Sequence, residues 1–212
     1  MRSIARLVER GAANFARPSE SDVIGNYFKG LLFTGSEDGL PDTRWIWLPT
    51  RAIVTPESSS IPKRLARQLR QSRFEVRFDH DFEAVMDVCR HSRPSTWITE
   101  EVLSVCRGLH SLGLVTTAGA YQNGNLVGGL WGFTIGRTFA IMSLFHTVDN
   151  AGNAAQVAVH ERLIRGEWDL LDLGPLTENN RRFGAFAVPT ESFLEMLLKQ
   201  QRRSVEADPP TS

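Results

Sequence analysis

The stretch LVTTAGAYQNGNLVGGLWGFTI, residues 114–135, predicts two antiparallel strands joined by a tight turn. Apolar arms flank Asn123 and Gly124, and Asn-Gly is the strongest short-range signal for a β-hairpin. The segment RTFAIMSLF (137–145) follows as a third strand. These residues therefore predict an antiparallel meander at the centre of the fold.

The chain beyond the meander predicts a helix, a strand and a second helix. NAGNAAQVAVHERLIRG (150–166) is typical of a helix that is opened by Asn150 and closed at Gly166. WDLLDLG (168–174) returns as a strand, and TESFLEMLLKQQRR (190–203) is again helical. This order describes an α+β fold from about Gly113 onward and resembles the N-acetyltransferase superfamily (GNAT-like).

The segment before the meander predicts helices around one further strand. SIPKRLARQLRQ (60–71) predicts a helix with Pro62 in its first turn, and RFEVRF (73–78) alternates as a strand. We expect Asp79 to cap the next helix. A further helix should follow STWITEE and turn four residues inward, namely Val102, Cys106, Leu109 and Leu112.

Composition indicates an ordinary globular protein. The 212 residues are 42% hydrophobic and 23% charged, with a formal net charge of zero, so any nucleic-acid surface must be a local patch. No stretch approaches about 18 consecutive apolar residues, so no membrane span is expected. The histidines lack metal-site spacing, so we expect no metal. Cys89 and Cys106 fall on helical apolar faces, which indicates buried thiols and a cytoplasmic protein.

Four regions are expected along the chain. Residues 1–25 would form an N-terminal helix or arm, because Ile4, Leu7 and Val8 suit an amphipathic helix better than a transit peptide. Residues 26–95 would form a small N-terminal α/β subdomain, residues 96–200 an acyltransferase-like domain, and residues 201–212 a disordered tail.

The helix predicted at 60–71 has one broad cationic face. At 100° per residue its four cations lie opposite Ile61, Leu65 and Leu69; these cations are Lys63, Arg64, Arg67 and Arg70. Such a ridge suits contact with phosphates. The alternative is an ordinary solvated helix face.

Two glycine-bearing segments raise the question of phosphate binding. VGGLWG (127–132) has no GxGxxG spacing and is not followed by a helix, so close strand packing explains it better. A CoA-dependent enzyme would grip phosphates at the turn TVDNAGNA (147–154), where Asp149 would repel a pyrophosphate. CoA is therefore disfavoured, and no cofactor is expected.

Asp172 stands alone between Leu171 and Leu173 in an apolar strand. A buried carboxylate is costly unless it is paired. One reading is that backbone N–H groups or an arginine hold it at a strand end. The other is that it lies in a cleft, where partial desolvation would make it a better proton acceptor.

Several of these segments together resemble the leucyl/phenylalanyl-tRNA–protein transferases. TWITEEVLSVCRGLHSLGL (96–114) followed by QNGNLVGGLWGFTIGR (122–137) carries the resemblance most specifically. Further matching segments are SSSIPKRLARQLRQSRFEVRFDHDFEAVMDVC (58–89), LLDLGPLT (170–177) and FGAFAVPTESFL (183–194).

The resemblance implies an aminoacyltransferase. Members move Leu, Phe or Met from aminoacyl-tRNA to the α-amino group of proteins that begin with Arg or Lys. This reaction is the aminolysis of an ester, so it implies neither a metal nor CoA. It also implies that Lys63, Arg64, Arg67 and Arg70 contact tRNA. The expected partners are aminoacyl-tRNA and a peptide or protein N-terminus, and the expected protein is a monomer that binds no membrane.

The resemblance also implies a site around Asp172. The family's catalytic pair is an Asp and a Gln two residues later, and here these positions hold Asp172 and Gly174. Strand alternation would place both on one face. The expected substrate-binding residues are Trp97, Leu130, Phe139, Met142, Ser143, Phe145, Asn150, Leu171 and Gly174, of which Trp97, Leu130, Phe139 and Leu171 would line an apolar pocket.

Three departures from the family pattern bear on the acceptor. Met142 replaces an acid, TTAGAY (116–121) lacks the family's His and Glu, and WIWLPTR (45–51) keeps only part of a longer motif, including Arg51. Losing the acid is hard to reconcile with a cationic acceptor. Three alternatives stay open: a small-metabolite amine as acceptor, an inert tRNA- or peptide-binding homologue, and CoA-dependent acetyl transfer.

Overall fold

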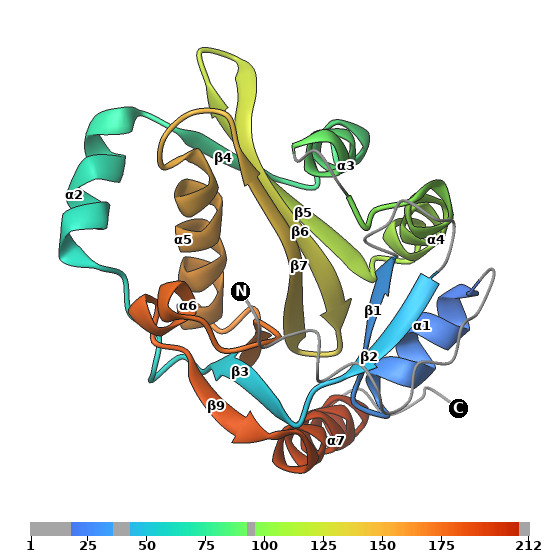
Figure 1. Ribbon diagram of the computed structural model, residues 1–212. Coiled ribbons are helices and arrows are strands. Elements are labelled where there is room, and N and C mark those ends of the chain that lie inside the picture. Colours follow the sequence, from blue (N-terminus) through green and yellow to red (C-terminus); the bar gives the residue numbers. More distant parts are fainter. Residues whose placement is uncertain (1–17, 36–42, 93–95, 208–212) are drawn as a thin grey trace.

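A mixed β-sheet dominates the computed structural model, which describes residues 18–35, 43–92 and 96–207. Within these residues the sheet has seven strands in the order β4-β5-β6-β7-β8-β3-β9, with α5 on one face and α3 and α4 on the other (Figure 1). The strands are β3 (Thr50–Val54), β4 (Glu75–Phe78), β5 (Val115–Gln122), β6 (Asn125–Ile135), β7 (Thr138–His146), β8 (Leu170–Asp172) and β9 (Phe186–Pro189). The expected α+β class is confirmed.

The β5–β6 hairpin forms where its turn residues predict it. Gln122 pairs with Asn125, and the two residues between them, Asn123 and Gly124, have φ of 52° and 80°. Positive φ at both central positions is the requirement of a type I′ turn, which Asn-Gly meets at low cost. The expected third strand, β7, pairs antiparallel with β6.

The β7–β8 pair is the one parallel pair of this sheet in the described residues. Helix α5 (Ala151–Ile164) makes the crossover between the two strands. The pairing is short, from Thr138 opposite Leu170 to Ala140 opposite Asp172. Because β7 continues to His146 while β8 ends at Asp172, the two strands part just beyond that carboxylate.

Two glycines of β6 allow close packing, Gly128 against α5 and Gly132 against β7. A Cβ on Gly128 would lie 2.5 Å from the Cβ of Ala151, at the start of α5. A Cβ on Gly132 would lie 2.2 Å from the carbonyl oxygen of Ala140 on β7. Close packing therefore accounts for these glycines, as predicted from the absence of a phosphate-loop pattern.

The remaining elements surround the sheet. β1 (Leu31–Gly35) and β2 (Thr43–Trp47) form a separate antiparallel pair. The other helices are α1 (Glu20–Tyr27), α2 (Lys63–Ser72), α3 (Phe82–His91), α4 (Glu100–Ser111), α6 (Glu178–Arg182) and α7 (Thr190–Ala207). No described helix is both long enough and apolar enough to span a membrane.

Two local predictions around α3 and α4 were wrong. Asp81, not Asp79, caps α3, and its side chain accepts a hydrogen bond from the Ala84 N–H at 3.0 Å. Asp79 has φ of 48° and accepts instead from the Thr117 N–H, because the helix begins later than expected. Leu112 is 64% exposed, because α4 ends at Ser111 before that position turns inward.

The predicted boundary at residue 95 separates segments whose strands belong to one continuous sheet. β3 and β4 come from the segment 26–95, yet they pair with β8 and β5 from the later segment. The boundary near residue 95 therefore stays a prediction. Helix α7 continues to Ala207, inside the segment expected to be disordered from residue 201, and the tail stays a prediction. Residues 1–17 and 208–212, which include the predicted amphipathic Ile4, Leu7 and Val8, lie outside the described residues.

Candidate functional site

Asp172 ends β8 as one half of a buried ion pair. One carboxylate oxygen, Oδ2, accepts hydrogen bonds from Arg51 Nη1 at 2.6 Å and from the Tyr27 hydroxyl at 2.8 Å. The other, Oδ1, accepts from the backbone N–H of Gly174 at 2.9 Å. Asp172 is 1% exposed and Arg51 is fully buried. The arginine and backbone N–H that one reading of the sequence required are therefore both present.

Arg51 is itself held from several directions. Its Nη2 donates to the carbonyl oxygen of Gly30 at 3.1 Å, and its guanidinium lies 5.6 Å from the ring centre of Tyr27 and 5.0 Å from that of Phe193. Strand β3, which carries Arg51, is hydrogen-bonded to the chain just after Asp172. Elements α1, β3, β8 and α7 thus converge on one ion pair.

Tyr27 acts as a donor in this arrangement. Burial raises the pKa of its hydroxyl well above the usual value, and the negative charge of Asp172 raises it further. The hydroxyl therefore stays protonated and keeps its hydrogen bond to the carboxylate. Sequence reasoning missed both Tyr27 and the pairing of Arg51, although an arginine within the apolar strand TRAIV was a signal that a buried anion faces it.

A cavity of about 180 Å³ opens beside the carboxylate. It lies where β7 and β8 part, and most of its lining is apolar. Its lining residues are Leu32, Phe33, Thr34, Ile46, Trp97, Ala140, Ile141, Met142, Asp172, Leu173, Gly174 and Pro175. Four of the predicted site residues meet here: Trp97, Met142, Asp172 and Gly174.

The carboxylate retains capacity for a further hydrogen bond. A carboxylate offers about four acceptor sites, and donors from Arg51, Tyr27 and Gly174 take three of them. Because Asp172 also lines the cavity, a donor bound there can reach it. The arrangement is suited to holding a neutral amine or a hydroxyl at the edge of an apolar space.

Gly174 does not continue the strand as predicted. β8 ends at Asp172, and Gly174 has φ of +66°, so strand alternation does not relate the two positions. The Asp172 side chain instead caps the Gly174 N–H, which is a local turn typical of Asp. A Cβ at Gly174 would meet only the Leu32 Cδ1, at 3.6 Å, so the position borders open space.

Three residues expected to line the pocket lie elsewhere. Leu130, Phe139 and Leu171 are fully buried and pack with Ala155 and Val159 under α5. Strand alternation explains the correction, because Phe139 and Leu171 face away from their neighbours Ala140 and Asp172. They belong to the core on the opposite side of the sheet.

Ser143, Phe145 and Asn150 also lie outside the lining of the cavity. Ser143 is half-buried opposite Trp131 on β6, and Phe145 is buried in the core. Asn150 precedes α5 with φ of 67°, and its side-chain oxygen accepts from Asn153 Nδ2 at 3.1 Å. Their assignment to substrate binding stays a prediction.

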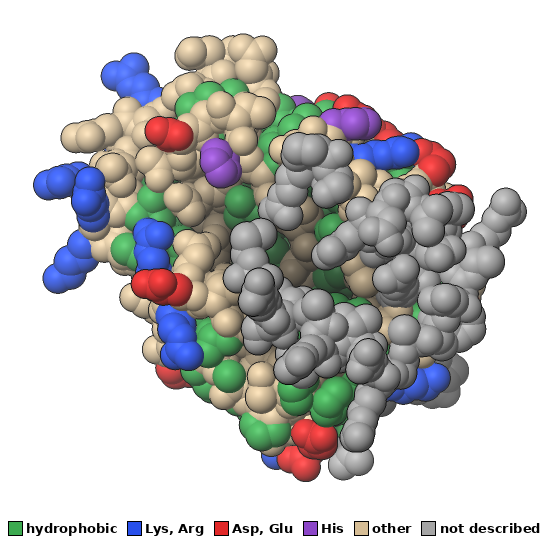
Figure 2. All heavy atoms as spheres, viewed as in Figure 1, with side chains coloured by type: hydrophobic (Ala, Val, Ile, Leu, Met, Phe, Trp, Pro, Cys, Tyr) green, Lys and Arg blue, Asp and Glu red, His purple; other side chains and the backbone are tan. Residues whose placement is uncertain are grey.

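The four cations predicted to contact tRNA lie on α2 and are exposed. Leu65 is buried on the opposite side of this helix, as predicted. In the part of the chain that the structure describes, none of the four forms an ion pair. Figure 2 shows Lys and Arg side chains projecting over α2 at the left edge. Contact with tRNA stays a prediction for this surface.

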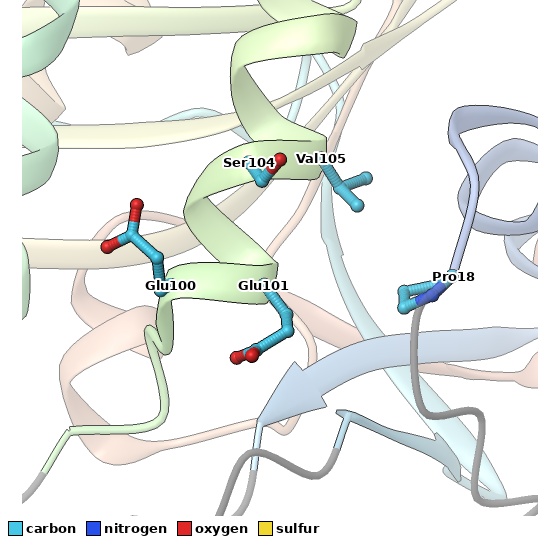
Figure 3. A pocket seen from close by; sticks show the side chains of 5 residues that line it. All are labelled: Pro18, Glu100, Glu101, Ser104 and Val105. Carbon is cyan, nitrogen blue, oxygen red and sulfur yellow. The ribbon is translucent and has the colours of Figure 1, made fainter.

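A second cavity of about 270 Å³ lies at the start of α4 (Figure 3). Val105 points toward Pro18, and Glu100, Glu101 and Ser104 also line the cavity. The Glu100 carboxylate is already engaged, because Arg90 and Arg107 donate to it at 2.7 Å and 3.2 Å. This cavity holds none of the predicted site residues.

The cysteines and possible metal ligands add no further site. Both Cys89 and Cys106 are buried, as predicted, and burial raises the pKa of the Cys106 thiol. Among the described residues, no three His, Cys, Asp or Glu side chains come together in a way that could hold a metal ion.

Comparison with known proteins identifies the family. The family described as leucyl/phenylalanyl-tRNA protein transferase matches residues 53–198. The leucyl/phenylalanyl-tRNA–protein transferase of Herpetosiphon aurantiacus is 34% identical over 184 residues, which cover 86% of this chain and 94% of that protein. That of Nitrobacter winogradskyi is 36% identical over 160 residues, 74% of this chain and 71% of that protein.

Solved structures are similar at a lower level. A GCN5-related N-acetyltransferase from Kribbella flavida superposes with a TM-score of 0.43 and 13% identity over 67% of this chain and 54% of that chain. Such values carry no argument about function. The match over residues 53–198 and the identity of the relatives do settle the family: the chain belongs to the leucyl/phenylalanyl-tRNA–protein transferases.

Proposed function

We propose that the protein transfers an apolar amino acid of the Leu, Phe or Met type from aminoacyl-tRNA to an amine, and that the amino acid binds in the cavity beside Asp172. The observation that carries this proposal is a buried carboxylate at the edge of an apolar cavity. Membership of the transferase family supports the donor.

The size of the cavity suits one side chain. Pockets for drug-sized ligands usually exceed about 300 Å³, whereas this one holds about 180 Å³. Its walls of Trp97, Ile141 and Met142 would favour an aliphatic or aromatic group through burial of apolar surface. The tRNA itself must then bind outside, and the exposed cations of α2 are our candidate for its phosphates.

The reaction is the aminolysis of an ester. The amine nitrogen forms a bond to the ester carbonyl carbon, and the bond from that carbon to the ribose oxygen breaks. The amine gives up a proton, and the departing ribose oxygen takes one, so an amide and free tRNA result. No electron transfer is involved, and the chemistry requires no cofactor.

Asp172 would orient the amine for attack. Three donors already surround its carboxylate, and Arg51 neutralises its charge. Its remaining acceptor site can hold one N–H of the amine or of the aminoacyl group in a fixed direction. Holding two reacting groups close together in the correct orientation is a large source of rate acceleration.

The acceptor is proposed to be a peptide or protein N-terminus, and the name of the family supports a protein as acceptor. Among the residues that line the cavity, Asp172 is the one carboxylate, and it is paired with Arg51. Among the described residues that line the cavity, a cationic first side chain would find no unpaired counter-charge. This observation favours an N-terminus with an uncharged first residue, and it makes a small neutral amine the second candidate.

The test is a transfer assay with purified protein. Leucyl-, phenylalanyl- and methionyl-tRNA would be incubated with peptides that begin with Arg, Lys, Ala or Leu and with a panel of small amines, and products would be identified by mass spectrometry. We expect an amide product that depends on charged tRNA. Binding of tRNA without product from any amine would overturn the proposal in favour of an inert binding protein.

Asp172→Asn tests the role of the carboxylate in the same assay. We expect a fall in kcat of about 100-fold with little change in tRNA binding, because an orienting contact is lost. Asp169→Asn is a matched control, since Asp169 pairs with Arg137 at a partly exposed position three residues earlier. A fall in kcat that is matched by an equal loss of folded Asp172→Asn protein, measured by circular dichroism, would assign Asp172 a structural role alone.

A further inference from the structure

Strand β7 has one edge that β8 covers only in part. β8 pairs with β7 as far as Ala140 and ends at Asp172, whereas β7 continues to His146 and leads into α5 (Figure 1). The two residues after Asp172 hydrogen-bond to Ala52 on β3 instead. Beyond Ala140, therefore, none of the described strands pairs with this edge of β7.

The uncovered part of the strand is also accessible. Residues 138–140, which β8 covers, are buried, whereas residues 141–144 are all half-buried. The accessible stretch ends at Phe145, which is buried. A Cβ on Gly152 of α5 would lie 2.9 Å from the carbonyl oxygen of Phe145, so the helix covers the strand there. An open edge thus lies between the end of β8 and the start of α5.

The cavity beside Asp172 lies at this edge and not on one face of the sheet. Ile141 packs with the core under α5, and Met142 packs with the core on the other face. Both nevertheless line the cavity. Side chains that point to opposite faces of a strand can border one space only where that space reaches the edge of the strand. The backbone edge between them therefore borders the cavity too.

A β-bulge marks the same place. Met142 has no partner in the register with β6, because Trp131 lies opposite Ser143 and the next residue, Gly132, lies opposite Ile141. A bulge leaves its extra residue unpaired and is often found next to an active site. The backbone of Met142 is therefore outside the regular ladder to β6 as well.

The open edge of β7 suits an extended peptide. An uncovered strand presents a row of backbone N–H and C=O groups. A peptide offers the same groups at the same repeat, about 3.3 Å per residue, and can pair with them through main-chain hydrogen bonds. A tRNA end is less suited to this edge, because its phosphates need positive charge and the described lining of the cavity includes neither Lys nor Arg.

We infer that the acceptor peptide binds along residues 141–144 as a short added strand, with its N-terminal amine beside Asp172. This inference rests on the proposed function. The amine must reach Asp172, which lies opposite Ala140, and β8 covers the edge before that point. The peptide must therefore run away from Asp172, parallel to β7 and in line with β8. Main-chain hydrogen bonds, and not a charge on the first side chain, would then hold the acceptor, while the transferred side chain takes the part of the cavity beside Trp97.

The first test varies the length of the acceptor in the transfer assay with the full-length protein. The donor is the aminoacyl-tRNA that gives most product, and the acceptors are alaninamide and peptides of two, four and eight residues built from Ala and Ser. We expect kcat/KM to rise with length up to about four residues, by about fivefold for each main-chain hydrogen bond gained, and then to level off. Equal kcat/KM for alaninamide and the eight-residue peptide would overturn the inference.

The second test removes one peptide N–H at a time. Only alternate residues of a strand direct their N–H toward a given neighbour. Single N-methylation at residues 2, 3 and 4 of the eight-residue peptide should therefore alternate between a loss of about tenfold in kcat/KM and little change. Methylation at residue 7, beyond the open edge, is the control. Losses that do not alternate along the peptide would contradict an added strand.

Amide hydrogen exchange locates the peptide on the protein. The eight-residue peptide, added without tRNA above its KM, should slow exchange in residues 141–144 and leave β9, at the outer edge of the sheet, unchanged. Transfer to peptides without this protection would overturn the inference and leave the proposed function in place. Protection by aminoacyl-tRNA but not by peptide would assign the edge to the donor and also overturn it. Absence of product from every amine would overturn the proposed function itself, and the inference with it.

Discussion

The ion pair of Arg51 and Asp172 and the cationic face of α2 use charge in opposite ways. The first is a single pair with almost no exposed surface, held at 2.6 Å by residues from four elements. The second is a row of exposed cations with no described acidic partner. In the sequence, Asp172 stands between two leucines, and the α2 cations follow one helical face.

The difference shows that a buried charge and an exposed charge affect the free energy of folding differently. A buried charge must be paired in the folded state, because removing one partner leaves the other desolvated without compensation. An exposed charge costs little and contributes little to folding, so it stays available for a ligand. The buried pair should therefore control stability and site geometry, whereas α2 should control only binding.

The largest effect on stability is expected from Arg51→Met. The substitution leaves Asp172 buried without its cation and should lower the free energy of unfolding by about 3–5 kcal/mol. Urea denaturation followed by circular dichroism would measure this. Arg137→Met is the matched control, because Arg137 pairs with Asp169 at a partly exposed site; it should cost less than about 1 kcal/mol. Similar losses of unfolding free energy in the two variants would show that the buried pair and the exposed pair contribute equally to stability.

A second buried ionisable group, His160, should make stability depend on pH. It is fully buried on α5, with Nδ1 2.8 Å from the Ser59 hydroxyl, and burial lowers its pKa to about 4. An unfolded histidine has a pKa of about 6.5. As pH falls from 6.5 toward 4, the unfolded chain binds a proton that the folded chain does not, so stability is lost through this window and is fully present above it.

The expected loss from His160 is roughly 3 kcal/mol across the window, because one pKa unit corresponds to about 1.4 kcal/mol. Urea denaturation between pH 4 and pH 7 would measure it. His160→Phe and His160→Gln should both flatten the dependence, since neither side chain titrates. Unchanged slopes in these two variants would show that other groups cause the pH dependence.

Gly174→Gln should cost about 1 kcal/mol of stability, because φ of +66° suits glycine and strains other residues. Gly174→Ala should cost the same, since both changes add a Cβ.

We expect no transfer to peptides that begin with Arg or Lys in the Gly174→Gln variant, because the amide would reach a cavity whose carboxylate is already paired. Gain of such transfer, measured by mass spectrometry, would show that Gly174 alone had redirected the acceptor.

The smallest effect on stability is expected from Arg67→Glu combined with Arg70→Glu, at less than about 0.5 kcal/mol. The tRNA affinity of this variant should nevertheless fall. The slope of log affinity against log salt should become shallower by about 2, because two phosphate contacts are lost. Arg181→Glu with Arg182→Glu on α6 is the control for total charge. An equal fall in affinity for both variants would remove the assignment of the tRNA surface to α2.

The elements that formed as predicted are those specified by neighbouring residues. The hairpin follows from Asn123 and Gly124, and α2 follows from apolar residues spaced at helical intervals opposite its cations. Wrong predictions arose where an element ended earlier or later than its pattern suggested. Leu112 and Gly174 lie just past such an end, and there the periodicity no longer says which way a side chain points.

Only part of the candidate site could be predicted from the sequence, for a different reason. That Asp172 needed a partner followed from its apolar neighbours, but the partners are remote, because Arg51 lies 121 residues away and Tyr27 lies 145 residues away. Residues such as Leu130, Phe139 and Leu171 were placed in the pocket by their apolar character. The pleat of the sheet put them on its other face.

The amino-acid sequence by itself determined the family, the meander, the exposed cations of α2 and the need to compensate a carboxylate at Asp172. Each depends on residue type and on neighbours within a few positions, and these act through backbone propensity and side-chain periodicity. The tertiary structure alone decided that Arg51 and Tyr27 meet this carboxylate, that β7 and β8 part to open a cavity beside it, and that an edge of β7 borders that cavity. These depend on strand order and helix packing, which bring distant segments together because burying their apolar faces in common lowers the free energy of the whole chain.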